Sequence, residues 1–205
     1  IKKKQKSADK HKTDDKGTSK SVSISDEFEP IINFSVASNL RILVTSSSLK
    51  IIKEIMRTAR IHKITITSTL RSAEKQADAM YENMQSKGIR SQLGYYSTAG
   101  REVIKSAIDA GGTDMDKTKQ VKSAMVAKII NLQNEGRVVS RHCVSEDMYA
   151  KRNVFDISKN FSTKESIQLV FDEALRNYVK NNNKFKYISP FKHRGEPAFH
   201  VEIEQ

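Results

Sequence analysis

Hydrophobic residues recur at helical spacing in five stretches of this chain, and the pattern predicts five helices. The first two stripes are Leu49, Ile52, Ile55, Met56 and Ala59, then Ala73, Ala77, Met80 and Met84. Gly88 follows the second stripe, where a glycine is typical of a helix C-terminus. In the last helical stretch, Ser162 and Glu165 have the spacing of a capping box, which predicts the start of that helix. The remaining three helices are expected over residues 100–112, 114–136 and 162–184.

Shorter stretches rich in β-branched and aromatic residues predict strands over residues 63–70, 136–143, 153–158, 184–190 and 197–204. In the last of these, Phe199, Val201 and Ile203 alternate with polar residues, so His200 and Glu202 are expected on the opposite face of the sheet. Helices and strands are interspersed, and the last two strands are close in sequence. We therefore expect an α+β fold in which a small antiparallel sheet packs with several helices.

The charge of the chain is concentrated near its start. Residues 1–20 hold eight lysines and three aspartates, a net charge of +5 out of a total of +12. A segment of this composition buries too little apolar surface to order itself, so residues 1–30 are expected to be a basic flexible tail or linker and residues 38–205 one domain. This charge composition is more typical of a solvated linker than of an arm that binds nucleic acid. An anionic polymer is a further candidate partner of the tail.

Other features of the composition exclude several classes of protein. No apolar run approaches the roughly 20 residues that span a bilayer, so no membrane span is expected. The chain has no tryptophan and no interleaved aromatic and basic pattern, which argues against nucleic-acid binding. Its single cysteine, Cys143, excludes an internal disulfide and is expected to be a small buried residue.

Deleting residues 1–25 is expected to change the melting temperature little, because this segment contributes no predicted core. Binding to an anionic polymer should weaken, more so at low salt, where charges are less screened. Thermal unfolding and co-sedimentation at two salt concentrations measure the two effects. An equal loss of folding stability would show instead that the tail packs on the domain.

Three predicted strands each carry a residue that binds metal ions well. His142 is the last residue but one of the strand expected over 136–143, Asp156 lies in the next strand and His200 in the last. Two imidazoles and one carboxylate on stiff elements suit a zinc ion that keeps a fourth position for water. Taken singly, each of these residues is more often a hydrogen-bonded side chain, and their spacing alone does not identify a metal site.

Four segments, TSTLRSAEKQ, SRH, NVFDIS and GEPAFHVE, resemble in this order the motifs of one peptidase family. This family contains the zinc D-alanyl-D-alanine carboxypeptidases and L-alanoyl-D-glutamate endopeptidases, and it shares its fold with the hedgehog signalling domain. The resemblance covers about residues 40–204. Thr69, Leu70 and Val154 depart from the residues that the family carries at those positions, and the segment between His142 and Asp156 is longer. We expect the sequence VSEDMYA, residues 144–150, to be an extra loop there.

The resemblance implies a zinc site and a role for each matching residue. His142, Asp156 and His200 would be the metal ligands, and Arg71, Gln76 and Ser140 would bind the substrate. Glu196 would be the general base, although the spacing from Glu196 to His200 is one residue longer than in many relatives. Glu202 is the reserve, because it lies two residues after His200 on the same expected face of the sheet.

The resemblance also implies an activity: a zinc-dependent peptidase that hydrolyses an amide bond in peptidoglycan stem peptides and acts at the cell wall. The alternative is a non-catalytic hedgehog-like zinc domain that serves as a binding module on a wall polymer or in a larger assembly.

Overall fold

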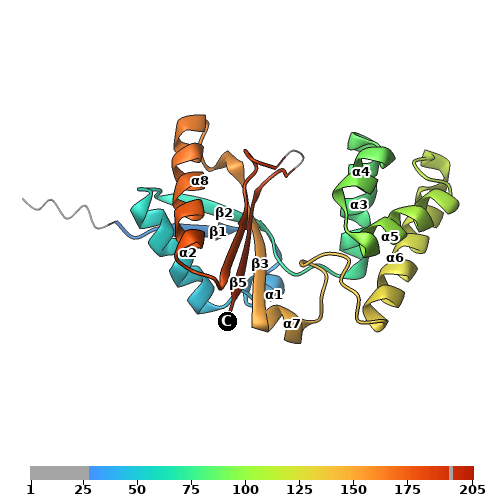
Figure 1. The fold of residues 1–205 in the computed structure, drawn as a ribbon, viewed down its shortest axis with the longest axis horizontal. Coiled ribbons are helices and arrows are strands. Elements are labelled where there is room, and N and C mark those ends of the chain that lie inside the picture. Colours follow the sequence, from blue (N-terminus) through green and yellow to red (C-terminus); the bar gives the residue numbers. More distant parts are fainter. Residues whose placement is uncertain (1–27, 194–195) are drawn as a thin grey trace, which may run out of the picture.

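The computed structural model describes residues 28–193 and 196–205, and it has an α+β fold (Figure 1). The strands are β1 (Ile31–Phe34), β2 (Lys63–Ser68), β3 (Arg152–Ile157), β4 (Phe185–Ile188) and β5 (Phe199–Glu204). The α-helices among these residues are α1 (Ser38–Arg41), α2 (Ser46–Thr58), α3 (Ala73–Lys87), α4 (Ile89–Tyr95), α5 (Thr98–Asp109), α6 (Thr118–Asn134), α7 (Glu146–Lys151) and α8 (Glu165–Lys180). Two short 3-10 helices cover Met115–Lys117 and Lys159–Phe161.

The strands form one mixed sheet in the order β1-β2-β3-β5-β4. Strand β1 runs parallel to β2, whereas the other neighbouring strands are antiparallel. The expected antiparallel sheet is therefore correct for four strands and wrong for β1. The hydrophobic stretch at residues 31–34 is short and lies between the expected tail and the expected domain, so the sequence predicts no strand there.

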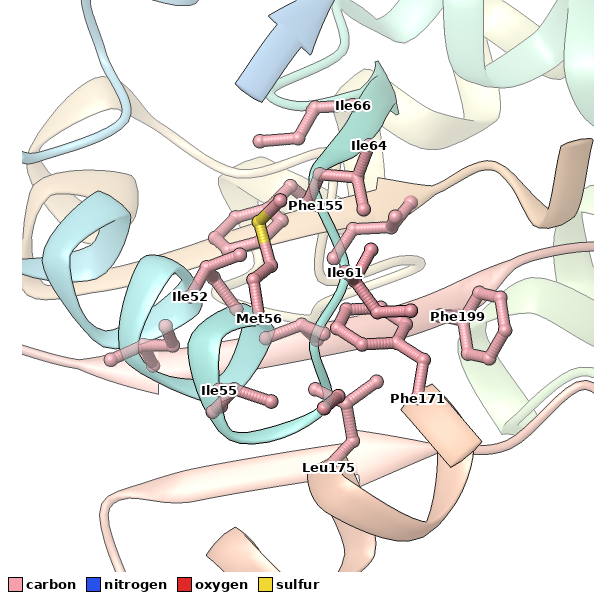
Figure 2. Packing of buried hydrophobic residues seen from close by; sticks show 14 of the residues in the cluster. Ile52, Ile55, Met56, Ile61, Ile64, Ile66, Phe155, Phe171, Leu175 and Phe199 are labelled. Atoms are coloured by element: carbon pink, nitrogen blue, oxygen red, sulfur yellow. The ribbon is translucent and has the colours of Figure 1, made fainter. Parts of the chain in front are cut away.

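One face of the sheet packs against helices α2 and α8. Alternate strand residues such as Ile64, Phe155 and Phe199 meet Ile52 and Phe171 from the two helices, and all are fully buried (Figure 2). The predicted alternation in β5 is confirmed, because Phe199, Val201 and Ile203 lie in this core. Asp156 of β3 and His200 and Glu202 of β5 therefore face the other side of the sheet.

A second hydrophobic cluster forms among helices α3, α4, α5 and α6, and it shares no residue with the first. We call these four helices the helical lobe, and the sheet with α1, α2, α7 and α8 the sheet lobe. In Figure 1 the helical lobe stands to one side of the sheet, and residues 69–72 and 135–145 connect the two lobes. The predicted stripe of α3 is confirmed, because Ala77, Met80 and Met84 are buried in the helical lobe.

Gly88 ends α3 as predicted and also begins α4. Its φ of 83° lies in the left-handed region that favours glycine, and its N–H donates to the carbonyl of Met84 at 3.1 Å. The chain therefore changes direction at this one residue, where α3 ends and α4 begins.

Three local predictions are wrong. Residues 136–143 form no strand and contain only an isolated bridge between Ser140 and Cys143, because the apolar residues here pack into the helical lobe. The expected loop at residues 144–150 contains helix α7, which starts where the Ser145 hydroxyl accepts a hydrogen bond from Met148 N. The capping box is absent: the Ser162 hydroxyl accepts from Lys164 N, and helix α8 begins after Lys164 without a side-chain cap.

The expected tail, residues 1–30, lies outside the described residues except for its last three. Within these three, the Glu29 carboxylate pairs with Lys53 and with Arg57 of α2. No helix in the described part of the chain has the length and apolarity needed to cross a membrane.

Asp172 of α8 is fully buried and holds the end of β4. Its carboxylate accepts hydrogen bonds from Tyr187 and Ser189 and, at 2.8 Å, from Arg176. Asp172→Ala leaves the buried Ser189 hydroxyl and the partly buried Tyr187 hydroxyl without this acceptor, so we expect a loss of about 2–4 kcal/mol in the free energy of unfolding. Chemical denaturation measures it, with exposed Asp109→Ala as the control at about 0.5 kcal/mol or less. Equal midpoints for the two variants would contradict the prediction.

Candidate metal centre

The polar face of the sheet brings Asp156 and His200 together. They are directly paired residues on the antiparallel strands β3 and β5, and Asp156 also lies opposite Ser68 at the end of β2. Neighbouring side chains on one face of such a pair lie close enough to share a ligand. The His200 Nδ1 atom is 2.9 Å from Asp156 Oδ1.

His142 reaches the same point from a tight turn between the lobes, not from the expected strand. The Cys143 N–H donates to the Ser140 carbonyl at 3.0 Å, and the Ser140 hydroxyl accepts from His142 N at 3.3 Å. The turn directs His142 Nε2 to within 3.1 Å of Asp156 Oδ1 and 3.3 Å of His200 Nδ1. Cys143 points instead into the helical lobe, where it is 1% exposed and burial raises its pKa to about 11. The prediction of a small buried cysteine is confirmed.

The hydrogen bonds of the two histidines orient their ring nitrogens for a cation. The Thr69 carbonyl accepts from His142 Nδ1 at 2.7 Å, so the proton is on Nδ1 and the lone pair of Nε2 faces Asp156. Glu202 lies 3.5 Å from His200 Nε2, which favours a proton on that nitrogen and a lone pair on Nδ1. Two lone pairs and a carboxylate oxygen therefore converge, an arrangement that needs positive charge between them.

The electrostatics of the cluster show the same demand for positive charge beside Asp156. Burial lowers the pKa of His200, but hydrogen bonds to Asp156 and Glu202 and the charges of Asp156 and Glu196 outweigh it and raise the pKa to about 9. Burial alone would raise the pKa of Asp156, yet the charges and hydrogen bonds of the two histidines hold it well below its usual range. The site thus favours an ionised carboxylate beside a positive group.

His142, Asp156 and His200 are the group among the described residues that could hold a metal ion. They are 4%, 9% and 9% exposed, so a bound ion would be largely shielded from solvent. The three residues that the sequence singled out as ligands are thus brought together by the fold.

Arg71 is tied to the cluster through Asp156. Its Nη2 lies 3.1 Å from Asp156 Oδ2, its Nε donates to the Ser68 hydroxyl at 2.9 Å, and Nη1 donates to Gln76 Oε1 at 3.4 Å. These contacts leave Asp156 Oδ1 to face the histidines. Gln76 is 1% exposed and Ser140 supports the turn of His142, so all three expected substrate-binding residues lie next to the ligands.

The two candidate bases have different surroundings. The Glu202 carboxylate lies 3.5 Å from His200 Nε2 and 3.5 Å from Arg152. Its Oε2 atom is buried and has no hydrogen-bond partner among the described residues. Although burial raises the pKa of Glu202, its contact with His200 lowers it below the ordinary value. Glu196 lies in the connection between β4 and β5 and accepts a hydrogen bond from the Tyr95 hydroxyl at 2.9 Å. Glu202 is thus placed to orient His200, and Glu196 is the carboxylate that does not touch a metal ligand.

Sequence reasoning missed three partners of the site: the Thr69 carbonyl, the contact of Glu202 with His200, and Tyr95. The alternation of β5 places Glu202 beside His200 on one face and could have suggested the second of these. A backbone carbonyl and a tyrosine from another lobe leave no such pattern.

Two surface grooves of the described residues lie away from the cluster. One of about 890 Å³ is lined by α3 and α6, and one of about 410 Å³ by α2 and α8; neither lining contains a metal-ligand residue. The clustered side chains, and not groove size, therefore identify the candidate site.

Comparisons of the chain with protein-family models, with curated proteins and with solved structures found no match.

Proposed function

We propose that this chain is a zinc-dependent peptidase of the hedgehog/DD-peptidase type, which hydrolyses an amide bond in peptidoglycan stem peptides. The observation that carries the proposal is the convergence of His142 Nε2, Asp156 Oδ1 and His200 Nδ1 within 3.3 Å of one another.

The ligand atoms fit zinc in number, type and spacing. Catalytic zinc sites have three protein ligands from His, Asp or Glu and bind them at about 2.0–2.2 Å, so tetrahedral coordination separates the ligand atoms by about 3.3 Å. The three separations here are 2.9, 3.1 and 3.3 Å. Glu202 and the Thr69 carbonyl supply the outer contacts that fix ligand histidines in known sites.

A bound zinc ion would polarise the scissile carbonyl and lower the pKa of a water molecule to about 7. Glu196 would take a proton from the attacking water and pass it to the departing amine, as a positioned carboxylate can. Arg71 has five N–H donors, of which three are bonded to Ser68, Gln76 and Asp156; the other two are available for a carboxylate of the stem peptide.

The alternative is a non-catalytic zinc domain that binds a wall polymer or an assembly partner. One observation favours it: two surface grooves, one between α3 and α6 and one between α2 and α8, lie away from the ligand cluster. In this case His142, Asp156 and His200 would hold a structural ion.

Incubating the zinc-loaded protein with purified peptidoglycan and analysing the released fragments by mass distinguishes the two functions. Cleavage of a stem-peptide amide bond is expected, and the fragment masses identify the bond. Full zinc occupancy with binding to peptidoglycan but no released fragments would replace the peptidase by the binding module.

A further inference from the structure

The helical lobe contributes one side chain to the neighbourhood of the ligand cluster. Tyr95 is the last residue of α4, and its hydroxyl donates a hydrogen bond to Glu196 Oε2 at 2.9 Å across a sequence separation of 101 residues. Glu196 belongs to the connection between β4 and β5, so this contact joins the helical lobe to the sheet lobe at a place distinct from the connecting segments.

Packing fixes the end of α4 that presents Tyr95. Ile89, Leu93 and Tyr96 pack against the hydrophobic cluster of the helical lobe, whereas Tyr95 is 51% exposed. Tyr96 lies against Gly100, where an added Cβ would come within 2.8 Å of its side chain. The neighbouring residue thus anchors the backbone and leaves Tyr95 directed at Glu196.

The electrostatics fix the direction of this hydrogen bond. Burial, then the charge of Glu196 and its hydrogen bond, raise the pKa of Tyr95 well above its ordinary value, and Asp156 acts in the same direction. The hydroxyl therefore keeps its proton at neutral pH and donates it to the carboxylate.

We propose that Tyr95 is a positioning residue that holds the carboxylate of Glu196 for proton transfer, a role that rests on the proposed peptidase function. A carboxylate accepts hydrogen bonds at both oxygens. Tyr95 is the side-chain partner of Glu196 among the described residues and bonds Oε2, which leaves Oε1 to exchange a proton.

The reaction then balances without any change at Tyr95. Oε1 of Glu196 takes one proton from the attacking water as the new C–O bond forms, and gives it to the amide nitrogen as the C–N bond breaks. The products are a carboxylic acid and an amine, the acid gives the second proton of the water to the amine to leave a carboxylate and an ammonium group, and Glu196 returns to its starting state. The Tyr95 proton remains in its hydrogen bond to Oε2 throughout, so the side chain restricts the carboxylate without entering the chemistry.

Tyr95→Phe removes the hydroxyl and keeps the ring. We expect kcat on peptidoglycan fragments to fall about 10- to 100-fold, because small displacements of a catalytic group reach a cost of about 100-fold. The KM should change less than about 2-fold, and zinc content and melting temperature should stay as in the wild type. Tyr96→Phe is the matched control: the next tyrosine loses a hydroxyl that bonds Asn83, and kcat should stay within about 2-fold.

A second measurement does not depend on activity. In protein labelled with ¹³C at glutamate carboxyl carbons, Glu196→Gln identifies the Glu196 signal by its loss. That signal should move in Tyr95→Phe at constant pH and should not move in Tyr96→Phe.

The outcomes separate this role from the proposed function. An active wild type with an unchanged kcat or an unmoved Glu196 signal in Tyr95→Phe overturns the role of Tyr95 and leaves the peptidase standing. A fully zinc-loaded wild type that cleaves no stem peptide overturns the peptidase and the positioning role together, even where the Glu196 signal moves.

Discussion

The wild-type protein, purified without chelator and offered zinc, is expected to bind about one ion per chain, and His142→Ala, His200→Ala and Asp156→Asn are expected to lose it. Each histidine variant removes one of three atoms that lie within 3.3 Å of one another, and Asp156→Asn replaces the carboxylate by a neutral amide, so two good ligands would remain where a zinc site needs at least three from the protein. Elemental analysis measures the stoichiometry. Thermal unfolding gives a second readout, because a free zinc concentration about 100 times Kd stabilises the native state by about 2.7 kcal/mol.

Asp156→Asn is the most informative of the three, since it keeps the shape of a residue that also pairs with Arg71. The control is His62→Ala, which removes an exposed histidine that stacks on Phe28 and lies outside the cluster. This control should bind zinc like the wild type and gain the same stability from it. A wild type without stoichiometric metal under these conditions would contradict the metal site itself.

Long periodic stretches made the main elements of the fold predictable. The stripes over α2 and α3 require one buried face each, and the alternation in β5 separates Phe199 from His200 whatever the tertiary structure. Periodicity identifies the buried residues but not the residues they pack against. The division into two hydrophobic clusters was therefore not visible in the sequence, although it sets where the site lies.

The wrong predictions have a common physical cause: tertiary packing outweighs the local sequence pattern. Val139 and Cys143 look like strand residues but are buried by the helical lobe, so the segment turns instead of pairing. Helix α7 is only six residues long, and β1 is a four-residue strand at the sheet edge. Elements this short carry too few residues for a period to appear.

The candidate site was found by resemblance more than by spacing. His142, Asp156 and His200 are 14, 44 and 58 residues apart in pairs, separations that no helix or single strand turns into proximity. The pairing of β3 with β5 supplies one of these contacts and the turn at Ser140 supplies the others. The partners that orient the ligands, such as the Thr69 carbonyl, follow only from the folded backbone.

Glu196→Gln is expected to abolish most of the hydrolysis while the protein stays folded and keeps its zinc. The substitution removes the proton acceptor but preserves the size of a side chain that contacts Tyr95 and no metal ligand. General-base catalysis typically contributes about 100- to 10,000-fold in rate, so the loss should be clear against an active wild type. Rates of stem-peptide cleavage and zinc content, measured on the same preparation, check both parts of the prediction.

Glu202→Gln supplies the contrast, because Glu202 lies behind His200 and beside Arg152. A residue that orients a metal ligand typically contributes about 10- to 100-fold to metal affinity, so this variant should need more free zinc and recover activity when zinc is raised. Glu196→Gln should stay inactive at every zinc concentration, since its defect is in proton transfer. The reverse pattern, with Glu196→Gln as fast as the wild type and Glu202→Gln inactive at saturating zinc, would assign the base to Glu202 and leave zinc-dependent hydrolysis in place.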